Sequence, residues 1–149
     1  MSVPFIDLKR TTALVREEVL PLWTECLDNC EFVGGPKVAA AEAELAKQMG
    51  TGHAIMVASG TDALQIALQA VGVGPGKKVA LPNLTFWATY EAVVQLGATP
   101  VLVDINPVDL QMSFAEFKLA FEKHRFEAAL LVHLYGWASQ DTVAFRDYC

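Results

Sequence analysis

The chain has 149 residues, of which 53% are hydrophobic and 19% are charged. This composition excludes a disordered, collagen-like or low-complexity chain and supplies enough apolar material for a folded core. Seventeen acidic residues against eleven basic ones give a net charge of −6, which counts against nucleic acid as a partner because phosphate-backbone binding requires several clustered cations.

The pattern of apolar residues argues against a membrane protein. The longest purely apolar runs, such as 54–58 and 128–132, have the length of a strand and not of a bilayer span. The first ten residues lack the apolar core and cleavage site of a secretory signal. We therefore expect a soluble cytoplasmic protein with no membrane partner.

The three cysteines do not form a disulfide framework, since Cys26, Cys30 and Cys149 are an odd and scattered set. A metal site at the first two would need further ligands, which no suitably spaced His or Cys supplies. We expect packing thiols and no metal.

The beginning of the chain is predicted to be helical. Apolar residues recur at three- and four-residue steps over 12–29, where Pro21 is expected to bend or interrupt the helix. The loop 32–36 contains two glycines that permit positive φ and a proline that suits a helix start. A second helix is predicted over 37–49 and ends at Gly50.

From residue 54 the pattern changes its period. The apolar run 54–58 predicts a strand covered on both faces. Ser59-Gly60-Thr61-Asp62 has the capping signature of a helix that ends at the glycine-rich stretch 72–76. The elements predicted after it are strands at 78–81, 100–104 and 128–134 and helices at 86–96, 114–123 and 142–148.

This alternation predicts an α/β fold, a mainly parallel sheet with helices on both faces. Residues 1–36 are expected to form an N-terminal helical segment and residues 37–149 an α/β domain. Ligands of such sheets bind at the carboxyl ends of the strands, so functional residues are expected in the turns that follow them.

One of these turns, Ser59-Gly60-Thr61, has the composition of a phosphate cup. Unpaired backbone N–H groups and the helix dipole favour an anion at a helix N-terminus. Gly60 permits close approach, and the hydroxyls of Ser59 and Thr61 can donate to phosphate oxygens. Taken alone, the tripeptide is more often a simple N-cap.

Two common nucleotide motifs do not fit the sequence. The stretch 72–78 has the wrong glycine spacing for a P-loop and precedes a strand. No G-x-G-x-x-G follows the first predicted strand, which removes the ordinary dinucleotide-binding fingerprint.

The next strand-to-helix turn is aromatic and contains Phe86, Trp87 and Tyr90. An aromatic at a helix start is more often part of the core, but beside a sheet crevice it can stack on a planar ring. A flat heterocycle with a phosphate group would need both this turn and the phosphate cup.

Motifs in a characteristic order run through the whole chain. They are Phe5-Ile6-Asp7-Leu8, Phe32-Val33-Gly34-Gly35-Pro36, Ala58-Ser59-Gly60-Thr61-Asp62-Ala63-Leu64, Gly74-Pro75-Gly76, Thr85-Phe86, Ala88-Thr89, Gly97-Ala98, Val103-Asp104-Ile105 and Val132-His133-Leu134-Tyr135-Gly136. Together they resemble the DegT/DnrJ/EryC1/StrS family of sugar aminotransferases. The resemblance implies the aspartate-aminotransferase fold (fold type I) and pyridoxal 5'-phosphate as cofactor.

The resemblance also assigns residues to the cofactor. Ser59, Gly60 and Thr61 would bind its phosphate, and Phe86 would stack on its pyridine ring. On this assignment, residues 37–149 are an incomplete pyridoxal-phosphate-binding large domain, and the C-terminal small domain is absent.

Further residues are implied at the substrate entrance. Gly34, Gly35 and Thr89 would lie there, where the partner subunit of a homodimer also contributes. Trp87 stands where the family more often has a small aliphatic residue and is assigned to packing.

Members of the family transfer an amino group from glutamate or glutamine to a nucleotide-linked keto-sugar. This reaction needs a lysine that carries the cofactor and an aspartate at the pyridine nitrogen. None of the seven lysines is predicted at a catalytic turn, and Asp141 and Asp147 adjoin or fall in the last predicted helix. We therefore expect both groups beyond Cys149, and a chain that is the N-terminal part of an enzyme and inactive alone.

His133, at a predicted strand end, has two interpretations. It faces the cofactor crevice, or it forms a hydrogen bond that fixes the Tyr135-Gly136 turn, and we favour the second. His53 and His124 are expected to be structural or exposed.

Three alternative functions stay open. A sugar dehydratase of the same family would have histidine in place of the lysine. The chain alone could be a non-enzymatic truncated module with exposed apolar strands. Another fold type I enzyme, such as an amino-acid lyase, would share the same cofactor site.

Overall fold

In the computed structural model, which describes residues 3–149, the chain forms two compact units. The first unit ends at Met56 and the second comprises Val57–Cys149. The domain division expected from the sequence, with a boundary after residue 36, stays a prediction.

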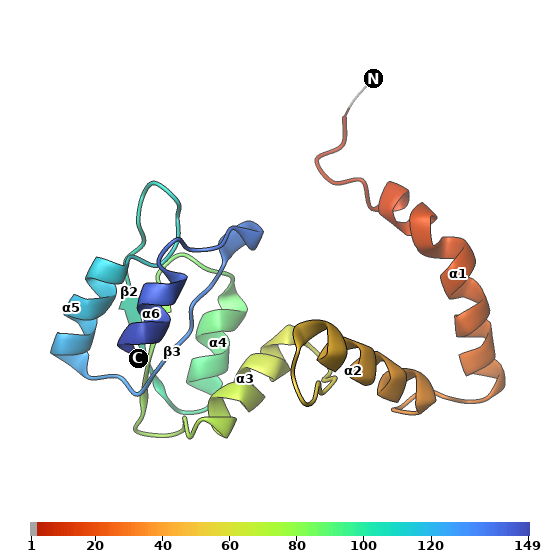
Figure 1. The fold of residues 1–149 in the computed structure, drawn as a ribbon, viewed down its shortest axis with the longest axis horizontal. Coiled ribbons are helices and arrows are strands. Elements are labelled where there is room, and N and C mark those ends of the chain that lie inside the picture. The colour runs from red at the N-terminus through yellow and green to blue at the C-terminus, as the bar shows by residue number, and fades with distance from the viewer. Residues whose placement is uncertain (1–2) are drawn as a thin grey trace. The chain divides into compact units, whose positions relative to one another are not determined.

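The first unit contains helix α1 (Leu8–Asp28) and helix α2 (Pro36–Met49). α1 begins four residues earlier than expected because the Asp7 carboxylate accepts a hydrogen bond of 3.2 Å from the Arg10 N–H, which caps the helix. The helix continues through Pro21 (Figure 1). The interruption considered for Pro21 is therefore wrong, and the missing N–H costs the helix a single hydrogen bond.

The connection between α1 and α2 is held by one lysine. Lys37 Nζ lies 3.1 Å from a carboxylate oxygen of Glu25 and 3.2 Å from one of Glu31. The end of α2 follows the sequence prediction, since Gly50 adopts φ of 65° and closes the helix in the left-handed region.

The strand predicted at 54–58 is wrong. The Met56 N–H donates to the Glu42 carboxylate of α2 at 2.8 Å, and the Ile55 side chain is 79% exposed. A buried strand needs a neighbour for its backbone groups, and within residues 3–149 none of the strands pairs with this segment.

The second unit is built on a parallel sheet of three strands in the order β2-β1-β3. β1 (Lys78–Pro82) pairs along its whole length with β2 (Thr99–Val103), and with β3 (Ala128–Ala129) on its other side. The α/β fold with a parallel sheet is thereby confirmed.

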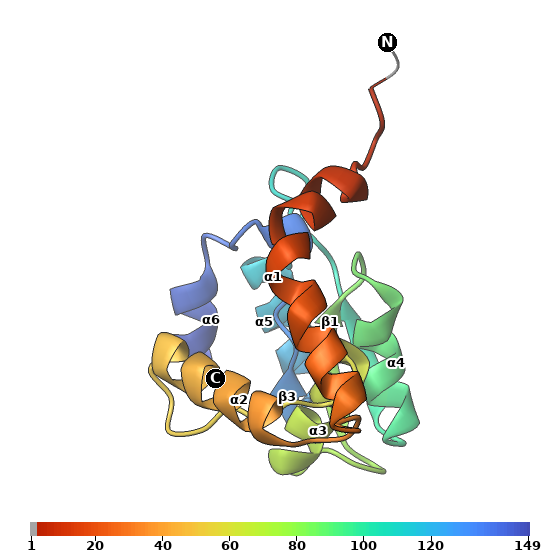
Figure 2. The same cartoon turned by 90° about the vertical axis from the view of Figure 1, so that its right-hand side faces the viewer.

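Helices cover both faces of this sheet (Figures 1 and 2). Val79 and Leu81 of β1 pack in one cluster with α3 (Gly60–Ala70) and α4 (Trp87–Gln95). Ala80, between them, points to the opposite face, as the strand period requires. The helices on that face are α5 (Phe114–His124) and α6 (Thr142–Tyr148).

β3 is shorter than the predicted strand 128–134. The pairing with β1 ends with a hydrogen bond of 2.8 Å from the Leu130 N–H to the Ala80 carbonyl. Pro82 closes β1 and has no N–H to donate, and the chain turns into a short 3-10 helix, η1 (Leu134–Gly136). The ladder therefore stops before the predicted end.

The cysteines are less buried than packing thiols would be. Cys30 and Cys149 are exposed, Cys26 is half-buried, and all three are free thiols. In the described range 3–149, none of the helices is long and apolar enough to cross a membrane.

Candidate functional site

The predicted phosphate cup lies at the start of α3. Ser59 is the N-cap: its Oγ accepts a hydrogen bond of 3.1 Å from the Asp62 N–H and donates one of 3.0 Å to the Asp62 carboxylate. This reciprocal pair fixes the first turn of the helix. The N–H groups of Gly60 and Thr61, which precede the capped one, have no partner within the helix.

The space around Gly60 suits a phosphate group. A Cβ built on this glycine would meet nothing within 4 Å, so a phosphate oxygen can approach the backbone closely. Ser59 is exposed and Thr61 is half-buried, which leaves both hydroxyls within reach of such an anion. The residues present therefore fit the phosphate end of pyridoxal phosphate.

Phe86 lies in the turn between β1 and α4. It is the N-cap residue of α4 in extended conformation, and its side chain is 76% exposed. An aromatic side chain this exposed makes little contribution to the core, so the more common interpretation of an aromatic at a helix start does not hold here. The ring is free to stack on a planar ligand.

The neighbouring aromatic residues divide between surface and core. The Trp87 ring lies 5.1 Å from that of Tyr90, which packs against the cluster of α3 and α4. Trp87 is nevertheless 63% exposed. It packs on one neighbour and leaves most of its surface to solvent.

The residues predicted at the substrate entrance lie in different surroundings. Thr89 is 6% exposed, and its hydroxyl lies 2.8 Å from that of Thr85. This bond ties the turn before α4 to the first turn of the helix. Gly34 and Gly35 belong to the first unit, where both have positive φ, of 66° and 93°.

The His133 ring forms a structural hydrogen bond, but with Ser139 and not with the Tyr135-Gly136 turn that the sequence prediction named. Its Nδ1 accepts a hydrogen bond of 3.2 Å from the Ser139 N–H, and the His133 carbonyl accepts one of 3.0 Å from the Gly136 N–H. With Nδ1 acting as acceptor, the neutral ring carries its hydrogen on Nε2.

Gln111 is a buried polar residue near these turns that sequence reasoning missed. It is 2% exposed; its Oε1 accepts a hydrogen bond of 3.2 Å from the Leu134 N–H and its Nε2 donates one of 3.1 Å to the Asp109 carbonyl. It thus ties the loop after β2 to the turn after β3. The sequence offers no periodic signal for a glutamine inside a loop.

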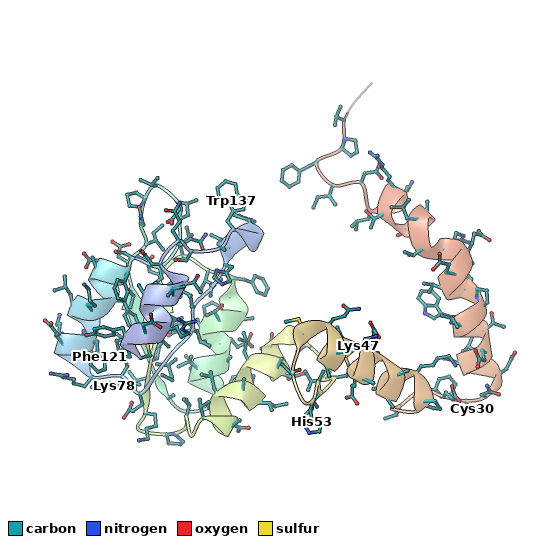
Figure 3. The ribbon with its side chains drawn as sticks, viewed as in Figure 1. Cys30, Lys47, His53, Lys78, Phe121 and Trp137 are labelled. Atoms are coloured by element: carbon teal, nitrogen blue, oxygen red, sulfur yellow. The ribbon has the colours of Figure 1, made fainter. Side chains whose placement is uncertain are left out.

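The lysines of the second unit lie at the start of β1 and on α5. Lys77 and Lys78 stand at the amino end of β1, where Lys78 Nζ donates to the His124 carbonyl at 2.8 Å (Figure 3). Lys118 lies over the Phe114 ring at 4.8 Å on α5.

The second unit is thus an α/β sheet with a serine-capped helix start at α3 and an exposed aromatic side chain at the start of α4. The model of the DegT/DnrJ/EryC1/StrS aminotransferase family matches residues 14–149. The chain belongs to this family.

Individual relatives agree with this assignment. The chain is 42% identical over 135 residues to the UDP-N-acetyl-3-dehydro-alpha-D-glucosamine 3-aminotransferase of Acidithiobacillus ferrooxidans, covering 91% of this chain and 36% of the relative. Among solved structures, S. venezuelae DesV superposes with a TM-score of 0.90 at 39% identity, over 97% of this chain and 38% of the other.

A further structure, NtdA from Bacillus subtilis with bound cofactor PMP, has a TM-score of 0.86 at 33% identity over 99% of this chain and 35% of the other. Other solved neighbours hold the same cofactor in its PLP and PMP forms. The cofactor of the family is pyridoxal phosphate. The chain spans a little over one third of the length of these relatives.

Proposed function

We propose that this chain provides the phosphate-binding cup and the ring-stacking residue for pyridoxal 5'-phosphate in a sugar aminotransferase. The observation that carries the proposal is the start of α3, where Ser59 caps the helix and the open backbone of Gly60 exposes N–H groups to an anion.

Each residue has a distinct task in this proposal. Bound pyridoxal phosphate supplies an electron-withdrawing ring that makes amino-group transfer possible. The N–H groups of Gly60 and Thr61 bind its phosphate, and the Ser59 hydroxyl turns its hydrogen from the Asp62 carboxylate to a phosphate oxygen. Phe86 stacks on one face of the ring and excludes water from it.

The relatives point to the substrate class. We propose that the enzyme moves an amino group from glutamate or glutamine to a nucleotide-linked keto-sugar, in keeping with the UDP-linked sugar in the name of the Acidithiobacillus relative. We also propose that it acts in the cytoplasm as a homodimer.

The reaction also needs a lysine bound to the cofactor and an aspartate at the pyridine nitrogen. The lysines of the second unit lie on helix surfaces or at the amino end of β1. We propose that these two groups come from residues other than these 149, so that the chain alone binds the cofactor without catalysing transfer.

Titration with pyridoxamine 5'-phosphate tests the cofactor site. This amine cannot condense with surface lysines, so it reports non-covalent binding, and pyridoxamine without the phosphate is the matched ligand. We expect saturable quenching of the ligand's fluorescence with the phosphate form alone. Equal binding of the two ligands, or none of either, would contradict the proposal.

The stacking role has its own variant. Phe86→Ala should weaken binding about three- to ten-fold, the range for loss of an aromatic pair. Phe32→Ala removes an aromatic side chain that is 68% exposed in the first unit and serves as the control. Equal loss in both variants would refute stacking by Phe86.

A further inference from the structure

A cavity lies at the carboxyl end of the sheet, away from the phosphate cup. It has a volume of about 230 Å³ and is formed by the loop after β2 and the turn after β3. Its lining residues are Asp109, Leu110, Gln111, Leu134, Tyr135 and Trp137. Because β2 and β3 flank β1 in the sheet, both segments border the turn that carries Phe86.

The two walls of this cavity are fastened to each other. The buried Gln111 carboxamide bonds to the Leu134 N–H on one wall and the Asp109 carbonyl on the other. The Asn106 N–H donates to the Gln111 carbonyl at 2.8 Å, which anchors the glutamine in its own loop. The cavity is therefore a built feature and not a gap between independent loops.

The backbone at the rim is held in a costly conformation. Leu110 and Tyr135 both have positive φ, of 60° and 56°. A left-handed conformation in a non-glycine residue costs roughly 1–2 kcal/mol, and such residues gather at ligand sites. Here the strain accompanies two exposed side chains, with Tyr135 89% and Leu110 40% exposed.

The exposed side chains have the chemistry of a sugar site. Tyr135 and Trp137, the latter 67% exposed, present flat apolar rings with a polar edge. Figure 3 shows Trp137 at the end of the second unit where the loop after β2 also lies. Asp109 uses one oxygen to accept the Gln111 N–H at 3.0 Å and keeps acceptor capacity for hydroxyl groups.

We propose that this pocket binds the pyranose ring of the sugar substrate, an inference that rests on the proposed function. A pyranose has apolar C–H faces, which pack on the rings of Tyr135 and Trp137. Sites that enclose a whole drug-sized ligand measure roughly 300–1,000 Å³. A cavity of about 230 Å³ suits one ring of a nucleotide sugar, with the remainder of the molecule outside.

Tryptophan emission tests the pocket directly. In the full chain with Trp23→Phe and Trp87→Phe, Trp137 remains the sole tryptophan of three. We expect N-acetylglucosamine to shift its emission saturably and glycerol, which has hydroxyls without a ring, to leave it unchanged. Absence of a saturable response to the sugar overturns the proposal.

Two matched pairs of variants locate the binding. In this background Tyr135→Ala should weaken sugar binding at least about five-fold, as expected for an aromatic contact residue. Tyr148→Ala, on α6 and outside this pocket, should not weaken it. Gln111→Leu should also weaken sugar binding. Gln95→Leu, which changes an exposed glutamine, should not. Equal effects within the pairs would overturn the assignment.

Folding and cofactor binding are followed separately. Tyr135→Phe retains the ring, so affinity within about two-fold of the parent chain is expected, and circular dichroism verifies that each variant is folded. A chain that binds pyridoxamine 5'-phosphate but no sugar refutes this pocket and leaves the cofactor site intact. Sugar binding without pyridoxamine 5'-phosphate binding refutes the cofactor site.

Discussion

The Asn83 carboxamide donates a hydrogen bond of 2.9 Å to the Asp104 carboxylate and so joins the turns that follow β1 and β2. The Asn83 N–H reinforces the link by donating to the Val103 carbonyl, also at 2.9 Å. Because Phe86 follows Asn83 by three residues, this link orients the turn that presents the ring-stacking side chain.

Asn83→Ala should raise the pKa of Asp104. In the native protein, the Ile105 N–H first and the Asn83 side chain second hold this pKa below its ordinary value of 3.8. The variant retains the Ile105 bond, so the pKa should stay below that ordinary value. A carboxyl-carbon NMR titration measures the shift, and the Glu127 resonance, at the amino end of β1, should not move.

The same pKa predicts the direction of a pH effect on stability. A carboxyl group whose pKa is lowered by folding contributes fully above its unfolded value, and the contribution is lost as pH falls through the lower, folded value. Acid unfolding of Asn83→Ala should therefore begin at higher pH than that of the parent chain. Identical acid transitions would show that the Asn83–Asp104 bond contributes nothing.

Phe117→Ala should destabilise the second unit by about 3–5 kcal/mol. Phe117 is completely buried, and the centroid of its ring lies 5.0 Å from those of Phe126 and Phe145. Leu119→Ala on the same helix, with Leu119 58% exposed, should change stability by less than about 0.5 kcal/mol. Urea unfolding compares the two, and similar losses would contradict the placement of the core.

Gly97→Ala should destabilise the protein and Gly74→Ala should not. Gly97 has φ of 69°, and a Cβ there would lie 3.2 Å from Pro75 Cγ, so alanine should cost about 1–2 kcal/mol. Gly74 has open surroundings and no left-handed φ, so alanine should be neutral or stabilise by up to about 1 kcal/mol. Thermal unfolding measures both, and a stable Gly97→Ala variant would refute the strained turn.

Local signals predicted much of this fold. The capping residue Ser59 precedes α3 and Gly50 ends α2, as predicted, because each effect lies within one helical turn. The strands β1 and β2 were found because each is a short apolar run between turns, buried under helices.

Predictions failed where structure depends on a neighbour distant in sequence. The run 54–58 has the composition of a strand, yet Met56 bonds to Glu42 in a helix. The short β3 depends on where Pro82 ends its partner strand. Apolar composition indicates burial but does not say which backbone will pair.

In the candidate site, too, the residues with a local signal could be predicted and the one that depends on a distant contact could not. Ser59, Gly60 and Phe86 could be proposed from the order of motifs, since a helix start and an aromatic turn are visible in sequence. Gln111 could not, because its burial and its hydrogen bond to Leu134 join segments that lie 23 residues apart in the sequence. Its importance is apparent only from its burial.

A comparison of Ser59→Ala with Ser113→Ala tests most directly whether the start of α3 binds the cofactor phosphate. Both serines cap helices by accepting an N–H three residues on, so both variants should lose about 1 kcal/mol of stability. Only Ser59→Ala should weaken the binding of pyridoxamine 5'-phosphate, by about three-fold or more. Unchanged affinity in Ser59→Ala, or equal loss in both variants, would contradict phosphate binding at the start of α3.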